Sequence, residues 1–260
     1  MGTYQIVTDS TADLTPELIR QLDVQVIPLC YMMGGRTYHT IPGGGEMTDR
    51  EFYAKLRGGA MSSTTQINSE EFLRVFTPLL EAGQDVLYIA FSSGLSGTCQ
   101  SAQLAREELQ KRFPQRKMVV FDSLCASMGE GLLVYYAAKL RQEGKSLEEV
   151  LAWLQENVLR LCHWFTVDDL NHLKRGGRVS TATALVGTML GIKPVLHVDD
   201  EGHLIPVSKV RGRKQSLDAL VRRMEETAQE PAGQMVFISH GDCLEDARYV
   251  ERQVREKLGA

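Results

Sequence analysis

The chain has 260 residues, of which 43% are hydrophobic and 24% are charged, and its formal net charge is −4 at pH 7. These totals fit a globular protein of one large domain or two small ones, and they argue against a general nucleic-acid binder. No apolar run reaches the roughly 18 residues of a transmembrane helix, and the first residues lack the basic start and apolar core of a signal peptide. We therefore expect a cytoplasmic protein.

The five cysteines and six histidines show no pattern that is typical of a metal site. There is no C-x-x-C pair and no H-E-x-x-H sequence, so neither a zinc site nor a thioredoxin motif is indicated. We expect reduced thiols, no metal and no cofactor.

The first predicted elements are a strand over 4–7 and a helix that begins at Pro16. Between them, Asp9, Ser10 and Thr11 follow the end of the strand. Ligands of open α/β sheets bind at this edge, so these side chains either cap a turn or line a site. Both alternatives stay open.

A second predicted strand covers 24–31, and a helix over 48–56 follows a glycine-rich loop. Residues 62–66 then form a cluster of hydroxyl side chains, just before a helix that begins at Ser69. These hydroxyls either cap that helix or close over a site elsewhere in the same half of the chain.

The most informative stretch begins with a buried strand over 86–91 and ends in a helix. The loop between them, 92–98, has four hydroxyl residues in seven and includes Ser92, Ser93 and Gly94. Glycine lets a ligand approach the backbone, and hydroxyls with free N–H groups at a helix N-terminus favour an oxygen-rich anion. The loop is either a capped turn or a carboxylate or phosphate site, and its hydroxyl content favours the site.

A strand over 118–121 and a helix over 125–140 come next, and Ser127 lies near the start of that helix. Glycines such as Gly131 inside a helix cost about 1 kcal/mol each, so a neighbouring helix or a ligand is expected to pack closely there. The repeated strand–helix pattern predicts an α/β domain over 1–159, with a parallel sheet and helices on both faces.

From residue 160 onward the pattern changes, and a second α/β domain over 160–260 with a mixed sheet and helices is predicted. We expect strands over 162–167, 194–198, 204–210 and 235–239, and helices over 168–173, 181–190, 215–227 and 244–258.

This second half also carries two basic clusters. They consist of Lys174, Arg175, Arg178, Lys209, Arg211, Arg213 and Lys214. The clusters are either a solvated face or a docking surface for an anionic ligand or an acidic partner.

Four motifs resemble those of the DegV family, in the family's order and over nearly the whole chain. They are Asp-Ser-Thr-Ala-Asp-Leu (9–14), Ser-Ser-Gly-Leu-Ser-Gly-Thr (92–98) with Gln-Ser-Ala (100–102), Leu-Lys-Arg-Gly-Gly-Arg-Val (173–179) and Lys-Pro-Val-Leu (193–196). The resemblance implies a two-domain bacterial lipid-binding protein that buries one long-chain fatty acid, for example palmitate. It also implies a role in fatty acid metabolism and transport, in which a separate fatty acid kinase subunit phosphorylates the carboxylate and this chain is not the enzyme.

The family holds the carboxylate with a Thr from a Thr-Ser-Gln-Pro segment and a Ser from the Ser-Ser-Gly segment, which correspond here to Thr64 and Ser93. Ile67 stands where the family has Pro. Family members usually continue to a His-x-Gly-Pro-Gly segment, whereas this sequence ends at Ala260. Candidate pocket-lining residues are Asp9, Ser10, Thr11, Ser92, Gly94 and Ser127, and candidate docking residues are Lys174, Arg175, Arg178, Arg211, Arg213 and Lys214.

Burial of a sixteen-carbon acyl chain contributes on the order of 10 kcal/mol before ordering costs, so the tail would supply affinity and a few hydroxyls would orient the head. A transient contact with a membrane is compatible with such a ligand. The alternative is a sugar-phosphate-binding enzyme or regulator that uses the Ser/Gly loop. A nucleophilic role for Ser93 is disfavoured, because no Gly-x-Ser-x-Gly motif surrounds it.

Overall fold

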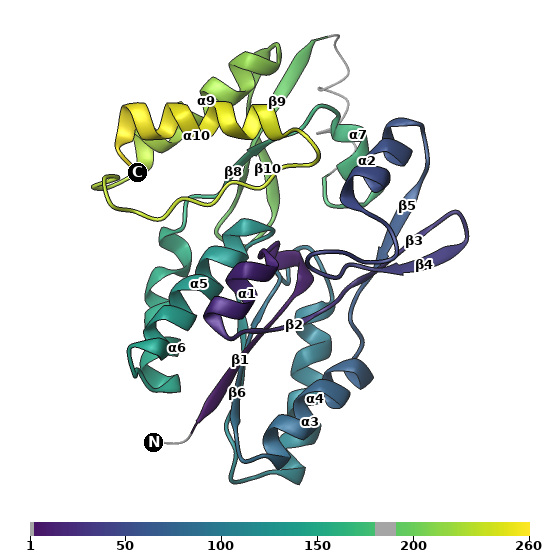
Figure 1. Ribbon diagram of the computed structural model, residues 1–260, viewed down its shortest axis with the longest axis vertical. Helices are drawn as coiled ribbons and strands as arrows, with labels where there is room; N and C mark the ends of the chain where they lie inside the picture. Colours follow the sequence, from purple (N-terminus) through teal and green to yellow (C-terminus); the bar gives the residue numbers. More distant parts are fainter. Residues whose placement is uncertain (1–2, 180–190) are drawn as a thin grey trace. The chain divides into compact units, whose positions relative to one another are not determined.

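The computed structural model describes residues 3–179 and 191–260 (Figure 1). The chain forms two compact units, Met1–Arg160 and Leu161–Ala260. The helix expected over 181–190 lies outside the described residues.

The first unit alternates strands and helices. Its elements are β1 (Tyr4–Asp9), a 3₁₀ turn (Ser10–Ala12), α1 (Pro16–Leu22), β2 (Gln25–Ile27), β3 (Cys30–Met33), β4 (Arg36–His39), α2 (Asp49–Arg57), β5 (Ser62–Thr65), α3 (Ser69–Glu81), β6 (Asp85–Ala90), α4 (Thr98–Arg112), β7 (Met118–Asp122), α5 (Met128–Gln142), α6 (Leu147–Asn157) and a second 3₁₀ turn (Val158–Arg160).

The main sheet of this unit has the strand order β2-β1-β6-β7, and all its pairs are parallel. Helices α3 and α4 cover one face, and α5 covers the other beside α1 and α6 (Figure 1). The predicted parallel sheet with helices on both faces is therefore confirmed.

From β1 the chain moves outward to β2 and later returns to the other side of β1 as β6, so the strand order reverses between β1 and β6. Ligands of open α/β sheets bind beyond the carboxyl ends of the strands at such a reversal.

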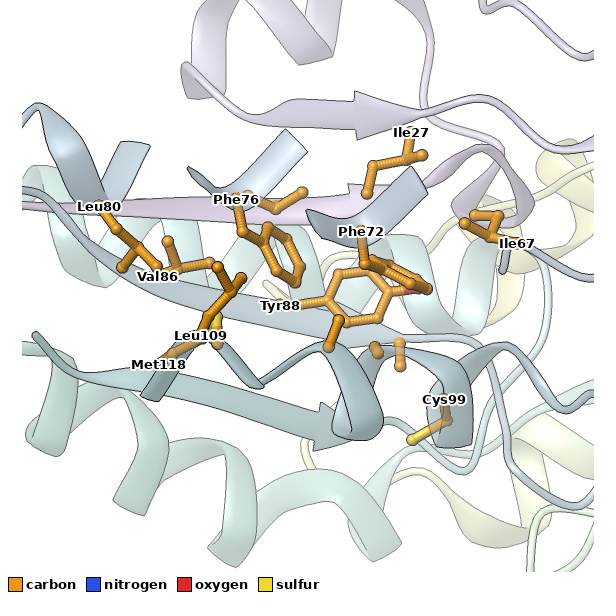
Figure 2. Close-up of a cluster of buried hydrophobic side chains, with 14 residues drawn as sticks. Ile27, Ile67, Phe72, Phe76, Leu80, Val86, Tyr88, Cys99, Leu109 and Met118 are labelled. Atoms are coloured by element: carbon orange, nitrogen blue, oxygen red, sulfur yellow. The ribbon is translucent and has the colours of Figure 1, made fainter. Parts of the chain in front are cut away.

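A hydrophobic cluster fills the space between this sheet and α3 and α4 (Figure 2). Phe72 and Phe76 of α3 are fully buried, and their ring centroids lie 5.0 and 5.9 Å from that of Tyr88 on β6. Tyr88 is buried as well, and its hydroxyl points along the sheet toward the carboxyl end of β1. The hydrophobic core is therefore linked to Asp9, at that edge, through the hydroxyl of Tyr88.

A second, smaller sheet was not expected. The predicted strand over 24–31 is wrong as a single element, because it divides into β2 and β3 around Pro28, which has no N–H group for a ladder. β3 leaves the main sheet and pairs in antiparallel fashion with β4 and β5. The hydroxyl cluster at 62–65 therefore forms the edge strand β5.

The helix expected over 125–140 starts later, at Met128. Leu124 and Ser127 have positive φ angles of 51° and 52°, which a right-handed helix excludes. Gly131, inside α5, faces the carbonyl oxygen of Ala12 so closely that no Cβ atom would fit. The chain's own loop after β1 therefore explains this glycine, rather than a ligand or a neighbouring helix.

We expect Gly131→Ala to destabilise the protein by about 1–3 kcal/mol, as is typical of overpacking. Alanine is the better helix former by about 1 kcal/mol, but the new methyl group would collide with a backbone carbonyl that cannot turn away. Urea unfolding at equilibrium measures the difference.

Gly97→Ala is the matched control. There the three atoms nearest to the added methyl group all belong to the end of the flexible Gln66 side chain, which can move. Its stability should stay within about 0.5 kcal/mol of the wild type. A Gly131→Ala protein that is as stable as this control would contradict the packing argument.

The second unit contains β8 (Trp164–Thr166), α7 (Leu170–Arg175), β9 (Ile192–Val198), β10 (Leu204–Arg211), α9 (Arg213–Thr227) and α10 (Leu244–Leu258). The strands form an antiparallel sheet in the order β10-β9-β8, with α9 packed against it and α10 against α9. The strand predicted over 235–239 is wrong, because a short apolar run alone does not specify a strand. Among the helices described, none is both long and apolar enough to cross a membrane.

Candidate functional site

Three loops meet at the carboxyl edge of the main sheet, after β1, β6 and β7. The backbone N–H of Ser93 donates to Asp122 Oδ1 at 3.2 Å, and the N–H of Ser92 donates to the Cys125 carbonyl at 3.0 Å. The hydroxyl of Ser127 donates to Asp13 Oδ2 at 2.5 Å. The loops that carry the candidate residues are therefore tied together beside the reversal between β1 and β6.

The second hydroxyl segment approaches the same edge. Gln66 Nε2 donates to Ser101 Oγ, and the backbone N–H of Ile67 donates to Thr98 Oγ1, each at 3.3 Å. Thr64 lies three residues before Ile67, which limits the distance between their Cα atoms to roughly 10 Å. The end of this segment, Gln66 and Ile67, is therefore bonded to the start of α4, while closure of its hydroxyls over the first loop stays a prediction.

The prediction that free backbone N–H groups of the Ser/Gly loop favour an anion is wrong for most of the loop, because these groups are already hydrogen-bonded. The N–H of Gly94 donates to Ser92 Oγ, and those of Leu95 and Ser96 donate to the Ser92 carbonyl. The N–H of Thr98 donates to Ser96 Oγ. Because Ser92 and Ser96 satisfy these donors, the loop offers a ligand its side-chain hydroxyls rather than these N–H groups.

Two of the candidate hydroxyls are available. Ser93 and Thr64 are exposed, and within the described residues neither side chain makes a hydrogen bond. Thr64 lies opposite Tyr31 in the small sheet, on the face where Tyr31 stacks on Tyr38 at 5.2 Å. Each of the two hydroxyls is therefore accessible without breaking any part of the fold.

The other candidate side chains hold the fold itself. Ser10 Oγ accepts from the N–H of Leu29 at 2.9 Å, and Ser92 is fully buried. Ser127 is held in a strained conformation (φ 52°, ψ −140°) by its bond to Asp13, and such strain is concentrated at functional sites. These residues shape the edge rather than offer free groups to a ligand.

A buried pair of carboxyl groups, Asp9 and Glu130, lies beneath the edge, and both side chains are fully buried. Asp9 Oδ2 accepts from Tyr88 Oη at 2.6 Å, and Asp9 Oδ1 accepts from the N–H and the hydroxyl of Thr11. Glu130 lies 2.9 Å from Thr8 Oγ1 and 3.0 Å from Thr11 Oγ1. Burial raises the pKa of Asp9 and raises that of Glu130 well above its ordinary value.

Sequence reasoning missed Glu130. Its signal was a single acid between Gly129 and Gly131, at the start of a helix whose small residues already indicated close packing. A surface helix would rarely place two glycines around a glutamate.

The candidate docking residues belong to the second unit. Arg175, Arg178, Arg211 and Lys214 are exposed, and Lys174 is half-buried. Asp168, just before α7, pairs with Lys193 at 2.8 Å. This bond and, to a lesser degree, the charge of Arg213 lower the pKa of Asp168. Lys193 also lies opposite Val210 on β10, so the segment before α7 lies beside the strand that carries Lys209 and Arg211.

Arg213 differs from the other basic residues because it already forms an ion pair inside the second unit. Its Nε lies 2.7 Å from Asp246 Oδ2, which joins α9 to α10. No group of three or more His, Cys, Asp or Glu side chains in the described part of the chain could hold a metal ion.

The DegV family model, described as a family of uncharacterised proteins, matches residues 3–260. A DegV domain-containing protein of Clostridium perfringens is 44% identical over 99% of this chain and 88% of its own length. The DegV domain-containing protein YteA of Lactococcus lactis is 45% identical over the same shares.

Solved structures of the same fold are also similar. A fatty-acid-binding DegV family protein from Thermus thermophilus is 34% identical, with a TM-score of 0.81 over 99% of this chain and 89% of that one. DegV of Bacillus subtilis, described as a fatty acid binding protein, is 29% identical, with a TM-score of 0.85 over 100% of this chain and 90% of that one.

Proposed function

The chain belongs to the DegV family, and from that premise we propose that it binds a long-chain fatty acid and presents the carboxylate to a separate fatty acid kinase in the cytoplasm. One observation carries the proposal. The exposed hydroxyls of Ser93 and Thr64 make no hydrogen bond within the described residues, and they come from two segments joined at the carboxyl edge of the sheet. The fatty-acid binding of the relatives from Thermus thermophilus and Bacillus subtilis supports the choice of ligand.

Two hydroxyl groups suit a ligand that must be passed on. They orient a carboxylate without the strong ionic bond that an arginine would form. Asp122, whose carboxyl group accepts from the Ser93 N–H, adds a nearby negative charge that weakens the hold on the head group. Affinity then comes from burial of the acyl tail, at roughly 0.8 kcal/mol per methylene.

The basic surface of the second unit is the proposed docking site for the kinase. Arg175, Arg178, Arg211 and Lys214 are exposed, and such a patch attracts an acidic partner or its bound nucleotide. Arg213 supports this surface through Asp246 rather than by contact with the partner. The chain itself performs no chemistry in this scheme.

Native mass spectrometry of gently purified protein tests the ligand. We expect a bound species with the mass of a long-chain fatty acid, which is lost on delipidation and restored when free fatty acid is added. Addition of the purified kinase with ATP and Mg²⁺ should then yield acyl phosphate. A phosphate ester as the only bound species would overturn the proposal in favour of the phosphate-binding alternative.

A further inference from the structure

The cluster around Asp9 and Glu130 contains more oxygen–oxygen contacts than hydroxyl protons. Three hydroxyl groups, those of Thr8, Thr11 and Tyr88, supply one proton each. They serve five contacts, which are Thr8–Ile89, Thr8–Glu130, Thr11–Asp9, Thr11–Glu130 and Tyr88–Asp9. If both carboxyl groups were ionised, two of these contacts would bring lone pairs together without a proton. A proton on one carboxyl group supplies a fourth donor, so that only one hydroxyl proton is shared between two acceptors, and the contacts therefore favour a protonated carboxyl group.

The surrounding donors show which carboxyl group carries the proton. Asp9 accepts from the hydroxyls of Thr11 and Tyr88 and from the backbone N–H group of Thr11. Within the described residues, Glu130 has only the two shared hydroxyls of Thr8 and Thr11. Three donors stabilise a charge on Asp9, so the proton belongs on Glu130. The N-terminal turn of α5 favours a charge on Glu130 only weakly compared with the cost of burying it.

Among the described residues, every titratable group that acts on the pair is an acid. They are Asp13 after β1, Tyr88 on β6, Cys99 on α4, and Cys125 before α5, which itself feels Asp122 at the end of β7. Together with burial, the negative neighbours Asp9 and Asp13 raise the pKa of Glu130. Its ionised form would be repelled by Asp9.

We propose that Glu130 is a neutral carboxylic acid in the native protein at neutral pH, and that its proton positions the loop after β1 against α5. This step rests on the proposed function, in which the fatty-acid head group binds at this loop and the two loops bonded to it. Glu130 is then a positioning residue, because it acts through Thr8 and Thr11 and does not touch the ligand. Its ionisation would break the bond through Thr11 and loosen the edge.

The stability that Glu130 contributes decreases as the pH rises. The pKa of Glu130 is higher in the folded chain than its ordinary value of 4.5. Its contribution to stability is therefore complete below that ordinary value and is lost as the pH rises through the folded pKa. From about pH 5 upward, this group alone should raise the unfolding equilibrium constant by up to tenfold per pH unit.

Urea unfolding of the delipidated full chain at pH 5, 6, 7 and 8 tests this, with Glu130→Gln and Glu130→Leu beside the wild type. Glutamine keeps a donor and an acceptor but cannot ionise. The unfolding equilibrium constant of Glu130→Gln should therefore equal that of the wild type at pH 5 and be at least tenfold lower than that of the wild type at pH 8. Leucine lacks both groups and should be less stable than glutamine at every pH. Infrared spectra should show a protonated carboxyl band in the wild type at pH 7 that Glu130→Gln lacks.

Parallel pH curves for the wild type and Glu130→Gln, or absence of that band, would overturn the proposal.

Fatty-acid retention then tests the positioning role separately. The wild type should lose ligand faster above the pH at which its protonated carboxyl band disappears than below it, to a greater degree than Glu130→Gln, which controls for titration of the ligand itself. Equal pH dependence in both proteins would remove the positioning role. If the stability result holds but neither protein retains a fatty acid at any pH, the proposed function fails while the protonation of Glu130 stands.

Discussion

Truncation of Phe72 to alanine should lower the free energy of unfolding by about 3–5 kcal/mol, the usual loss for a buried phenylalanine. Its ring is 0% exposed and packs against those of Phe76 and Tyr88, with centroid distances of 5.4 and 5.0 Å (Figure 2). The first unit cannot close this gap easily, because the ring lies between α3 and the sheet. Urea unfolding with an unchanged slope would show that stability, rather than compactness, has changed.

Leu104→Ala is the control for this prediction. Leu104 is 52% exposed on α4, the helix beside α3, and its truncation should cost no more than about 0.5 kcal/mol. Equal losses for the two variants would mean that the cluster in Figure 2 does not carry the stability of this unit. The Phe72 variant should also weaken ligand binding, because Tyr88 links the same cluster to Asp9.

The elements that follow local rules were predictable from the sequence. The capping boxes of Thr48 with Glu51 and of Ser146 with Glu149 are both present. Thr15 caps α1 with Pro16 at the first helical position, as expected. Each of these signals lies within four residues of sequence, so no tertiary contact is needed to specify it.

Strand pairing was less predictable, because it depends on residues far apart in the chain. The apolar run over 24–31 resembles one strand, yet its second part pairs with Arg36–His39 and Ser62–Thr65 rather than with β1. The run over 235–239 has the composition of a strand but does not form one. Periodicity over so few residues does not show which partner a segment finds.

The candidate site shows the same division. Its position after β6 followed from the strand–loop–helix pattern, and the motif resemblance singled out Ser93 and Thr64. The use of the loop's N–H groups within the loop could not be foreseen, because it depends on the backbone bending around Ser92. Glu130 was missed because its partners Thr8 and Thr11 are about 120 residues away, which single-sequence patterns cannot connect.

Removal of the two free hydroxyls should reduce fatty-acid affinity far more than stability. A hydrogen bond to a charged group contributes about 1.5–3 kcal/mol, so Ser93→Ala and Thr64→Val should each weaken binding by roughly 10- to 150-fold. The double variant should lose less than the product of the two factors, because both hydroxyls would serve one carboxylate. Displacement of a fluorescent fatty acid from the delipidated protein measures these affinities.

The same variants separate a ligand role from a structural one. Neither hydroxyl makes a bond within the described residues, so the free energy of unfolding without ligand should change by no more than about 0.5 kcal/mol. Ser63→Ala is the matched control, because Ser63 is an exposed hydroxyl on β5 and adjacent strand residues face opposite sides of a sheet. Its affinity should equal that of the wild type. Unchanged affinity in the Ser93 and Thr64 variants, or a loss as large in Ser63→Ala, would place the head group elsewhere.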